Sequence, residues 1–512
     1  MQKVRGKKVK KRPVKTKKSG KAEQGNRRNI FTPVFVCALM LTLPLAVSNG
    51  YYNITKTKSV CFYVLACAFV AATVLFYGGT ALLRKQKPKF NKEAILPLDI
   101  AMLCFAGTGV LSALLSEFQK DVWIGEKARY QGAVTICLYA AVYFCLRFRF
   151  RPVKAFVPCA AIGFCAVCIF GVLNCFDIDL LGFYAPITVQ YKPLYISTIG
   201  NINFYSCYLC LLLPLVLYTY CTAEKKWKKV FYLSAVAVGG FGMMVTGSES
   251  FVLGFSAGLA AMLFFCFDDA KKMKRLLIGC GVLLVCAQAF VLISRFAPVT
   301  NVELSLLLSY FIKPYIAAPA AVLLAALYFL AHRLEHLLPL LKRVYTVLLI
   351  TGVVTVAVLF LLANTVGLPW LNEVFFIDNQ WGTNRGMIWK QCLALFKEFS
   401  LGEKLFGIGP EALQRISDGN TISAGKTLDQ AHNEYLQYLL TGGLCGLLAY
   451  LSIPVTVIVC IVRKAKQKPC MIALFCPLVA YWAQAIVNIA QPFTAPIMFV
   501  FVALIGALTG EE

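Results

Sequence analysis

The chain has 512 residues, of which 59% are hydrophobic and 15% are charged, and its mean hydropathy is +0.70. This composition excludes a soluble globular domain, in which only about 45–50% of residues are apolar. The formal net charge of +27 comes from 51 Lys and Arg against 24 Asp and Glu. Apolar runs long enough to cross a bilayer recur along the chain. Such runs must be helical, because lipid offers the backbone no hydrogen-bond partner.

The first 29 residues form a basic tail that contains 13 Lys or Arg and one acidic residue. The basic region is too long for a signal peptide, and no small-residue cleavage site follows the first apolar run. We interpret residues 1–29 as a disordered cytoplasmic segment that fixes the topology and contacts anionic lipid. Nucleic-acid binding is the alternative, but no folded reader or interleaved aromatic residues accompany the tail, so no nucleic-acid partner is expected.

Fourteen candidate spans follow the tail. They lie near 30–48, 59–83, 94–115, 132–147, 154–173, 201–221, 230–246, 250–267, 276–294, 305–330, 344–363, 434–462, 470–488 and 494–510. With the N-terminus inside, the inside segments carry 37 Lys or Arg and the outside loops carry 13. This bias predicts that both termini are cytoplasmic. The 21 cysteines lie mostly within these spans, and we interpret them as packing residues.

The predicted fold class is therefore an all-α, polytopic transmembrane bundle of about 12–14 spans. Residues 30–363 supply about eleven spans, and residues 432–512 supply about three. Residues 364–431 form one large extracytoplasmic loop, which is far too long to be a simple connector.

The large loop contains an amphipathic helix, NRGMIWKQCLALFKEF, with an apolar stripe at helical spacing and Thr383 or Asn384 as a cap. Arg385 falls in its first turn, where a cation opposes the helix dipole. The segment FGIGPEALQRI follows, with a tight turn between Gly407 and Gly409 and a short helix from Pro410. A polar arm then leads to His432. We interpret the loop as a lid over a cavity that opens to the outer leaflet.

Two residues of the outside region have chemistry suited to group transfer. The guanidinium of Arg385 can hold phosphate oxygens, and the imidazole of His432 can take a proton from a hydroxyl near neutral pH. The pair fits transfer from a diphosphate donor to an alcohol. The alternatives remain open at this point: Arg385 as an interfacial cation that snorkels, and His432 as a helix-start residue at the membrane surface.

Four stretches resemble the O-antigen ligase and O-antigen polymerase superfamily of bacterial membrane glycan transferases. They are AHNEYLQYLLTGGLCGLLAY, NRGMIWKQCLALFKE with LFGIGPEAL, TIGNINFYSCYLCLLLPL and VTGSESFVLGF, with weaker support from EKARYQGAVTICLYAAVYF. The resemblance covers most of the chain after Leu96. It implies an enzyme that transfers a glycan from undecaprenyl diphosphate to an acceptor hydroxyl on the outer face of the bacterial plasma membrane. It also implies that no cofactor or metal is needed.

The resemblance assigns roles to individual residues. Arg385 matches the loop arginine that contacts the diphosphate, and His432 matches the histidine proposed as general base. Asn433 follows it in the same motif, and Asn201 and Asn203 match substrate-binding positions at the start of a span.

Two positions depart from the family pattern. Glu249 stands where the family often has an arginine that contacts the diphosphate, and Ile202 stands where it often has proline. Another outside cation is then expected to substitute, with Arg129, Arg295 and Lys192 as candidates. We expect Arg129 or Arg295 to pair with Glu249, which is otherwise a solvated turn residue.

Two other functions compete with the transferase. A flippase for lipid-linked oligosaccharides, or another multispan transporter, also suits such a bundle, and Lys313-Pro314 within a span is the feature that favours it. A membrane scaffold is the third alternative. The expected partners of the transferase are the lipid-linked glycan donor, membrane lipid, and a glycan, lipid, wall-polymer or protein acceptor, and the sequence does not distinguish among these acceptors.

Overall fold

The computed structural model describes residues 30–83, 95–126, 129–149, 155–297, 299–301, 304–366, 375–417 and 428–510. The predicted basic tail lies outside these ranges, as does most of the predicted polar arm that precedes His432. The described chain is almost entirely helical, and its strands are the two-residue β1 (Tyr195–Ile196) and β2 (Gly200–Asn201), which pair antiparallel. The all-α fold class is confirmed.

Each of the fourteen predicted spans overlaps one of fourteen long helices. They are α1 (Phe31–Leu45), α2 (Ile54–Leu83), α3 (Pro97–Leu115), α4 (Ala133–Arg149), α5 (Phe156–Cys175), α6 (Ile202–Thr222), α7 (Lys226–Met244), α8 (Glu249–Cys266), α9 (Ala270–Ser294), α11 (Pro314–Arg333), α12 (Leu338–Thr365), α17 (Glu434–Lys464), α18 (Cys470–Gln484) and α19 (Ala495–Gly510). Among the described residues, ten helices are long and apolar enough to cross a membrane, and α1, α4 and α19 are shorter apolar helices.

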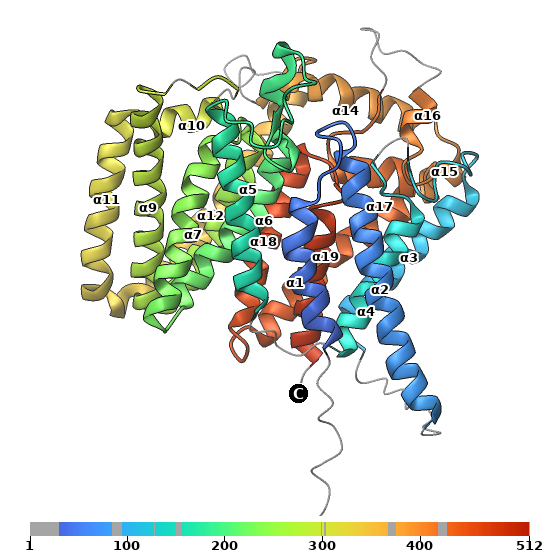
Figure 1. The fold of residues 1–512 in the computed structure, drawn as a ribbon, viewed down its shortest axis with the longest axis horizontal. Coiled ribbons are helices and arrows are strands. Elements are labelled where there is room, and N and C mark those ends of the chain that lie inside the picture. The colour runs from blue at the N-terminus through green and yellow to red at the C-terminus, as the bar shows by residue number, and fades with distance from the viewer. Residues whose placement is uncertain are drawn as a thin grey trace, which may run out of the picture.

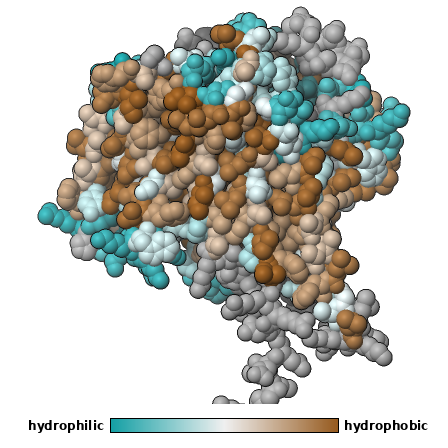
Figure 2. Space-filling model, in the orientation of Figure 1, coloured by the Kyte–Doolittle hydropathy of each residue, from teal (hydrophilic) through white to brown (hydrophobic). Residues whose placement is uncertain are grey.

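The remaining described helices lie outside the fourteen, and all of them except the 18-residue α14 are short. They are η2 (Val189–Leu194), α10 (Leu306–Phe311), η3 (Glu335–Leu337), α14 (Trp381–Glu398), α15 (Leu401–Phe406), α16 (Leu413–Ser417) and η4 (Ala485–Val487). Helices α10, α14, α15 and α16 gather at one end of the bundle, and the C-terminus lies at the opposite end (Figure 1). On the face shown in Figure 2, an apolar band crosses the bundle between two more polar ends, as expected of a multi-pass membrane protein.

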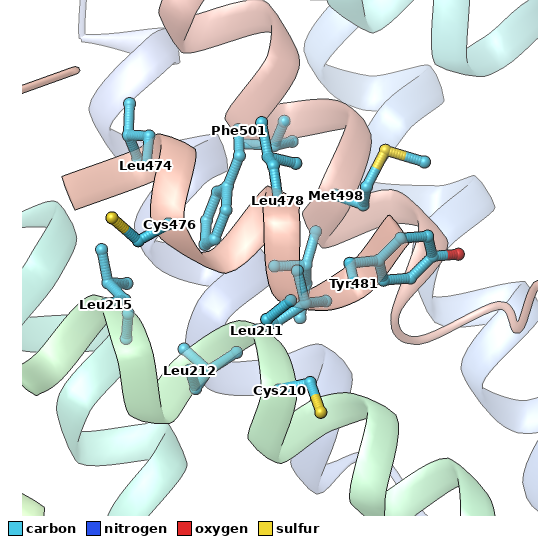
Figure 3. Packing of buried hydrophobic residues seen from close by; sticks show 14 of the residues in the cluster. Cys210, Leu211, Leu212, Leu215, Leu474, Cys476, Leu478, Tyr481, Met498 and Phe501 are labelled. Atoms are coloured by element: carbon cyan, nitrogen blue, oxygen red, sulfur yellow. The ribbon is translucent and has the colours of Figure 1, made fainter. Parts of the chain in front are cut away.

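Helix α6 forms the centre of the bundle. Of the 18 consecutive residues that make up its most apolar part, 89% are buried. Its apolar residues Cys210, Leu211 and Leu215 pack against α18 and α19 in a continuous core (Figure 3). By contrast, only 6% of the residues are buried in the most apolar part of Glu335–Thr365, so α12 lies at the periphery. The bundle therefore has a buried centre around α6 and an exposed edge at α11 and α12.

Two details of the predicted spans are corrected. The predicted span 305–330 is divided into α10 and α11, and Lys313 lies at their junction with its ammonium 4.5 Å from the centre of the Tyr310 ring. Helix α2 begins at Ile54, five residues before the predicted start, and its Lys58 is fully buried. The Lys58 ammonium donates to the carbonyl oxygens of Leu43 and Pro44, so this lysine caps the end of α1.

Candidate active site

Helix α17 starts with the motif that contains His432. The side-chain oxygen of Asn433 accepts hydrogen bonds from the N–H groups of Tyr435 and Leu436, at 3.0 and 3.1 Å, and so caps the helix. His432 precedes this cap with a φ of 48°, in the left-handed region. This sharp turn places the imidazole at the start of α17 rather than along its side.

Helix α17 is broken at Gly443, whose φ is 65° and ψ −168°. The N–H groups of Ile408 and Gly409 donate to the carbonyl oxygens of Leu440 and Thr441, both at 3.1 Å. The large loop therefore supplies hydrogen bonds to backbone that the break leaves without helical partners, which is how irregular backbone is tolerated inside a membrane protein. Gly407 and Gly409 have positive φ, as the predicted tight turn requires.

The start of α14 differs from the prediction. Neither Thr383 nor Asn384 caps it: Gly382, Thr383 and Asn384 all have positive φ and interrupt the helix. Arg385 follows this interruption, and its Nη1 donates to the Gly382 carbonyl oxygen at 2.8 Å and to Thr383 Oγ1 at 3.1 Å. The three residues with positive φ therefore determine the direction in which the Arg385 guanidinium points.

Arg385 and His432 lie within electrostatic range of each other. Burial is the main cause that lowers the pKa of His432 below its usual 6.5, and the charges of Arg385 and Arg129 lower it further. The Asp429 carboxylate opposes them, with Oδ1 at 4.0 Å from His432 Nε2. Two cations, one carboxylate and the imidazole thus form one charged cluster at the N-terminal end of α17.

Buried N–H groups on this cluster have no partner. Three of these N–H groups are buried from solvent and donate to no described residue. They are the Nε groups of Arg385 and Arg129 and the indole Nε1 of Trp389. Arg385 and Trp389 are four residues apart and share one face of α14. Burial also lowers the pKa of Arg385, although an arginine stays charged at any physiological pH. Such donors are suited to binding an oxyanion.

The predicted partner of Glu249 was wrong. Arg129 Nη2 instead donates to Asp429 Oδ2 at 2.9 Å. Glu249 is exposed, and its carboxylate accepts from the N–H of Leu307 at 3.2 Å and from Ser305 Oγ at 3.4 Å, at the start of α10. Arg295 is an exposed residue at the end of α9 and forms no ion pair with a described residue. The physical reason is that one backbone N–H and one hydroxyl at the start of α10 satisfy the Glu249 carboxylate, while Asp429 binds the Arg129 guanidinium.

The other predicted substrate-binding residues have structural hydrogen bonds. Asn201 caps α6 by accepting from the N–H of Asn203 at 2.9 Å. Asn203 Oδ1 accepts from Ser248 Oγ at 2.6 Å, which joins α6 to the start of α8. The Lys192 ammonium lies over the ring of Tyr184, 5.7 Å from its centre. These contacts leave the role of the asparagines in substrate binding as a prediction.

The prediction for residues 410–417 was partly wrong, and it missed a residue of the site. The short helix α16 begins at Leu413 rather than at Pro410, because Glu411 has a φ of 61°. Glu411 is buried and lines a cavity of about 40 Å³ together with Gln131, Gln430 and Glu434. Neither His432 nor Arg385 lines this cavity. An acid next to a Gly-x-Gly-Pro turn was the only signal for Glu411 in the sequence.

The fold and the cluster together describe a polytopic membrane protein with a partly buried charged cluster where a large loop meets the bundle. Residues 303–451 match the family model described as O-antigen ligase, a segment that contains Arg385, Glu411 and His432. Over this segment the match confirms the resemblance to the O-antigen ligase and polymerase superfamily, and it supports an O-antigen ligase-type membrane glycosyltransferase. A comparison with curated proteins found no match.

Proposed function

We propose that the protein transfers a glycan from undecaprenyl diphosphate to an acceptor hydroxyl at the outer face of the bacterial plasma membrane. In this proposal both termini of the chain lie in the cytoplasm. The observation that carries this proposal is the cluster in which two guanidinium groups with unpaired, buried N–H donors lie within electrostatic range of His432. The donors are suited to the diphosphate, and the imidazole is suited to the acceptor.

In the proposed reaction, His432 accepts the proton of the acceptor hydroxyl while that oxygen forms a bond to the anomeric carbon of the donor glycan. The bond between that carbon and the diphosphate oxygen breaks, and undecaprenyl diphosphate leaves with the electron pair. Arg385 stabilises the negative charge that develops on the leaving oxygen. The lowered pKa of His432 keeps its imidazole neutral, and therefore basic, at neutral pH.

The features of the site do not include a group of metal ligands. Among the described residues, no three or more His, Cys, Asp or Glu side chains are grouped so that they could hold a metal ion. We propose a reaction that depends on the two arginines for charge stabilisation, and we expect EDTA to leave turnover unchanged. Loss of turnover on chelation, restored by one divalent ion, would refute this part of the proposal.

The decisive experiment incubates the purified protein in detergent with a polyprenyl-diphosphate glycan. Longer glycans on the lipid would identify a polymerase, and transfer to an added acceptor would identify a ligase. The alternative function is a flippase, which in proteoliposomes would move the lipid-linked glycan across the bilayer and form no glycosidic bond. Lys313 lies between α10 and α11, immediately before the start of α11, and so it is not a charged residue in the middle of a span.

A further inference from the structure

Glu411 is a buried acid that the proposed reaction does not use. Only 7% of its surface is exposed, and its φ of 61° lies in the left-handed region that favours glycine. Burial raises the pKa of its carboxyl group to about 7. A strained backbone that carries a buried acid persists only where surrounding contacts hold it in place. These contacts therefore indicate what the residue does.

One oxygen of the Glu411 carboxyl group joins three separate segments of the chain. Oε2 accepts the backbone N–H of Arg129 at 2.9 Å and the Nε2 of Gln430 at 3.1 Å. Gln430 is the neighbour of Asp429, which pairs with the Arg129 guanidinium and lies 4.0 Å from His432. These contacts form a closed network of hydrogen bonds. Glu411 binds the backbone of Arg129 and the side chain of Gln430, and the adjacent Asp429 binds the side chain of Arg129.

The surroundings leave room for this acid. Gly125 has a φ of 74°, and a Cβ atom at that position would lie 2.5 Å from Glu411 Cγ. The second oxygen, Oε1, accepts no hydrogen bond from any residue that the structure describes. The two contacts of Oε2 are therefore the connections that Glu411 makes to the cluster, and a carbonyl oxygen in the same place could accept both of them.

We propose that Glu411 is the positioning residue of the candidate site, because its Oε2 fixes Arg129 and the segment 429–433 relative to each other. It thereby determines where the Arg129 guanidinium and the His432 imidazole stand. Glu411 does not touch the reacting groups. The inference rests on the proposed function for its catalytic consequence, whereas the placement of His432 by Glu411 can be measured without any substrate.

The first experiment measures His432 directly. The chain has three histidines, so substitution of His332→Asn and His336→Asn leaves His432 as the only one. Its carbethoxylation rate by diethyl pyrocarbonate, followed against pH in the full-length protein, gives its accessibility and its pKa. Asp429, Arg385 and Arg129 are the charged groups that face it. In this background we compare Glu411→Ala, Glu411→Gln and Glu398→Ala, an exposed acid of the same loop.

We expect Glu411→Ala to speed the modification of His432 and to raise its pKa toward 6.5, because the released segment lets water reach the imidazole. Glu411→Gln keeps a carbonyl acceptor and should behave like the parent, as should Glu398→Ala. In transferase assays, Glu411→Ala should lower kcat by about 100-fold, the size of effect seen when reacting groups are misplaced. Glu411→Gln should stay within about threefold of the parent.

Three results have defined meanings, with folding checked by melting temperature in detergent. If Glu411→Ala remains folded and leaves the His432 rate and pKa unchanged, the positioning role is overturned. If Glu411→Gln is as impaired as Glu411→Ala, the charge or proton of Glu411 matters, and positioning through hydrogen bonds is likewise overturned. If the His432 signal changes as expected but no variant and no parent protein transfers glycan, positioning is supported and the proposed function fails.

Discussion

The residues of the candidate site combine charge with burial. His432 is turned by a positive φ, Arg385 follows three residues with positive φ, and Glu411 has one of its own. Non-glycine residues in this region are uncommon and concentrate at functional sites. Burial also shifts the pKa values of these side chains: it lowers the pKa of His432 and raises that of Glu411.

At the residue scale, the fall of kcat/KM at acidic pH, the acid limb of the profile, tests directly whether His432 is the general base. Its pKa is lowered, so the neutral form that can accept a proton persists to a pH below 6.5, and kcat/KM should fall only at lower pH. His432→Ala should reduce kcat by about 100-fold or more. Asp429→Asn removes the carboxylate that raises this pKa, so the limb should move to lower pH. A limb above pH 6.5, or one that Asp429→Asn moves upward, would contradict the assignment.

Arg385 supplies the second prediction at the residue scale. Arg385→Ala should lower kcat by about 100-fold or more, since the loss of one buried donor to a developing oxyanion has that effect. Arg385→Lys should recover only part of the activity, because an ammonium cannot reproduce the planar fork. The control is Lys397→Ala, an exposed cation in the last turn of the same helix, which should turn over like the parent. Equal losses at positions 385 and 397 would indicate a general charge effect rather than a site.

At the scale of elements, the site depends on the contact between the large loop and the broken helix α17. Gly407 has a φ of 76°, and a Cβ atom there would lie 2.3 Å from the carbonyl carbon of Thr441. Likewise, a Cβ atom at Gly443 would lie 2.3 Å from the carbonyl carbon of Leu405. The two backbones therefore touch at glycines on both sides, and this contact aligns Glu411 and His432.

This contact predicts the effect of Gly407→Ala. The substitution should destabilise the protein by at least about 1 kcal/mol, from the positive φ alone, and more from the overlap with Thr441. Melting temperature in detergent measures it. Gly402→Ala is the matched control, because a Cβ atom there meets only Ser400 Oγ at 4.0 Å and alanine favours the helix α15. If both variants melt at the same temperature, the loop does not depend on this close approach.

Some of these elements were predictable from the sequence and others were not. The spans follow from hydropathy because lipid excludes every backbone conformation without internal hydrogen bonds. The break at Gly443 was not predicted, because the apolar run of α17 continues across it and its new hydrogen bonds come from the loop about 35 residues earlier. Likewise, Arg129 or Arg295 was expected to pair with Glu249. No local rule in the sequence indicates that Arg129 would pair with Asp429, 300 residues later.

The whole molecule places its polar elements at opposite ends of an apolar band (Figures 1 and 2). The loop helices α14, α15 and α16 lie at one end. At the other end, Arg275 Nη1 donates to the carbonyl oxygens of Cys221 and Ala223, and Lys342 pairs with Asp268 at 2.7 Å. Basic residues thus occupy the end opposite the site and hold its helix ends together. This is the distribution expected if that end faces the cytoplasm.

The sidedness itself is the last prediction. Alkaline phosphatase folds only outside the cytoplasm, so a fusion after residue 366, beyond α12, should be active, and a fusion after residue 224, beyond α6, should be inactive. Fluorescent protein joined to the C-terminus should fluoresce, because that end of α19 is expected inside. The physical basis is the excess of Lys and Arg in the inside loops, which retains those loops in the cytoplasm during insertion. Activity at 224 together with none at 366 would invert the topology, and His432 would then face away from a donor in the outer leaflet.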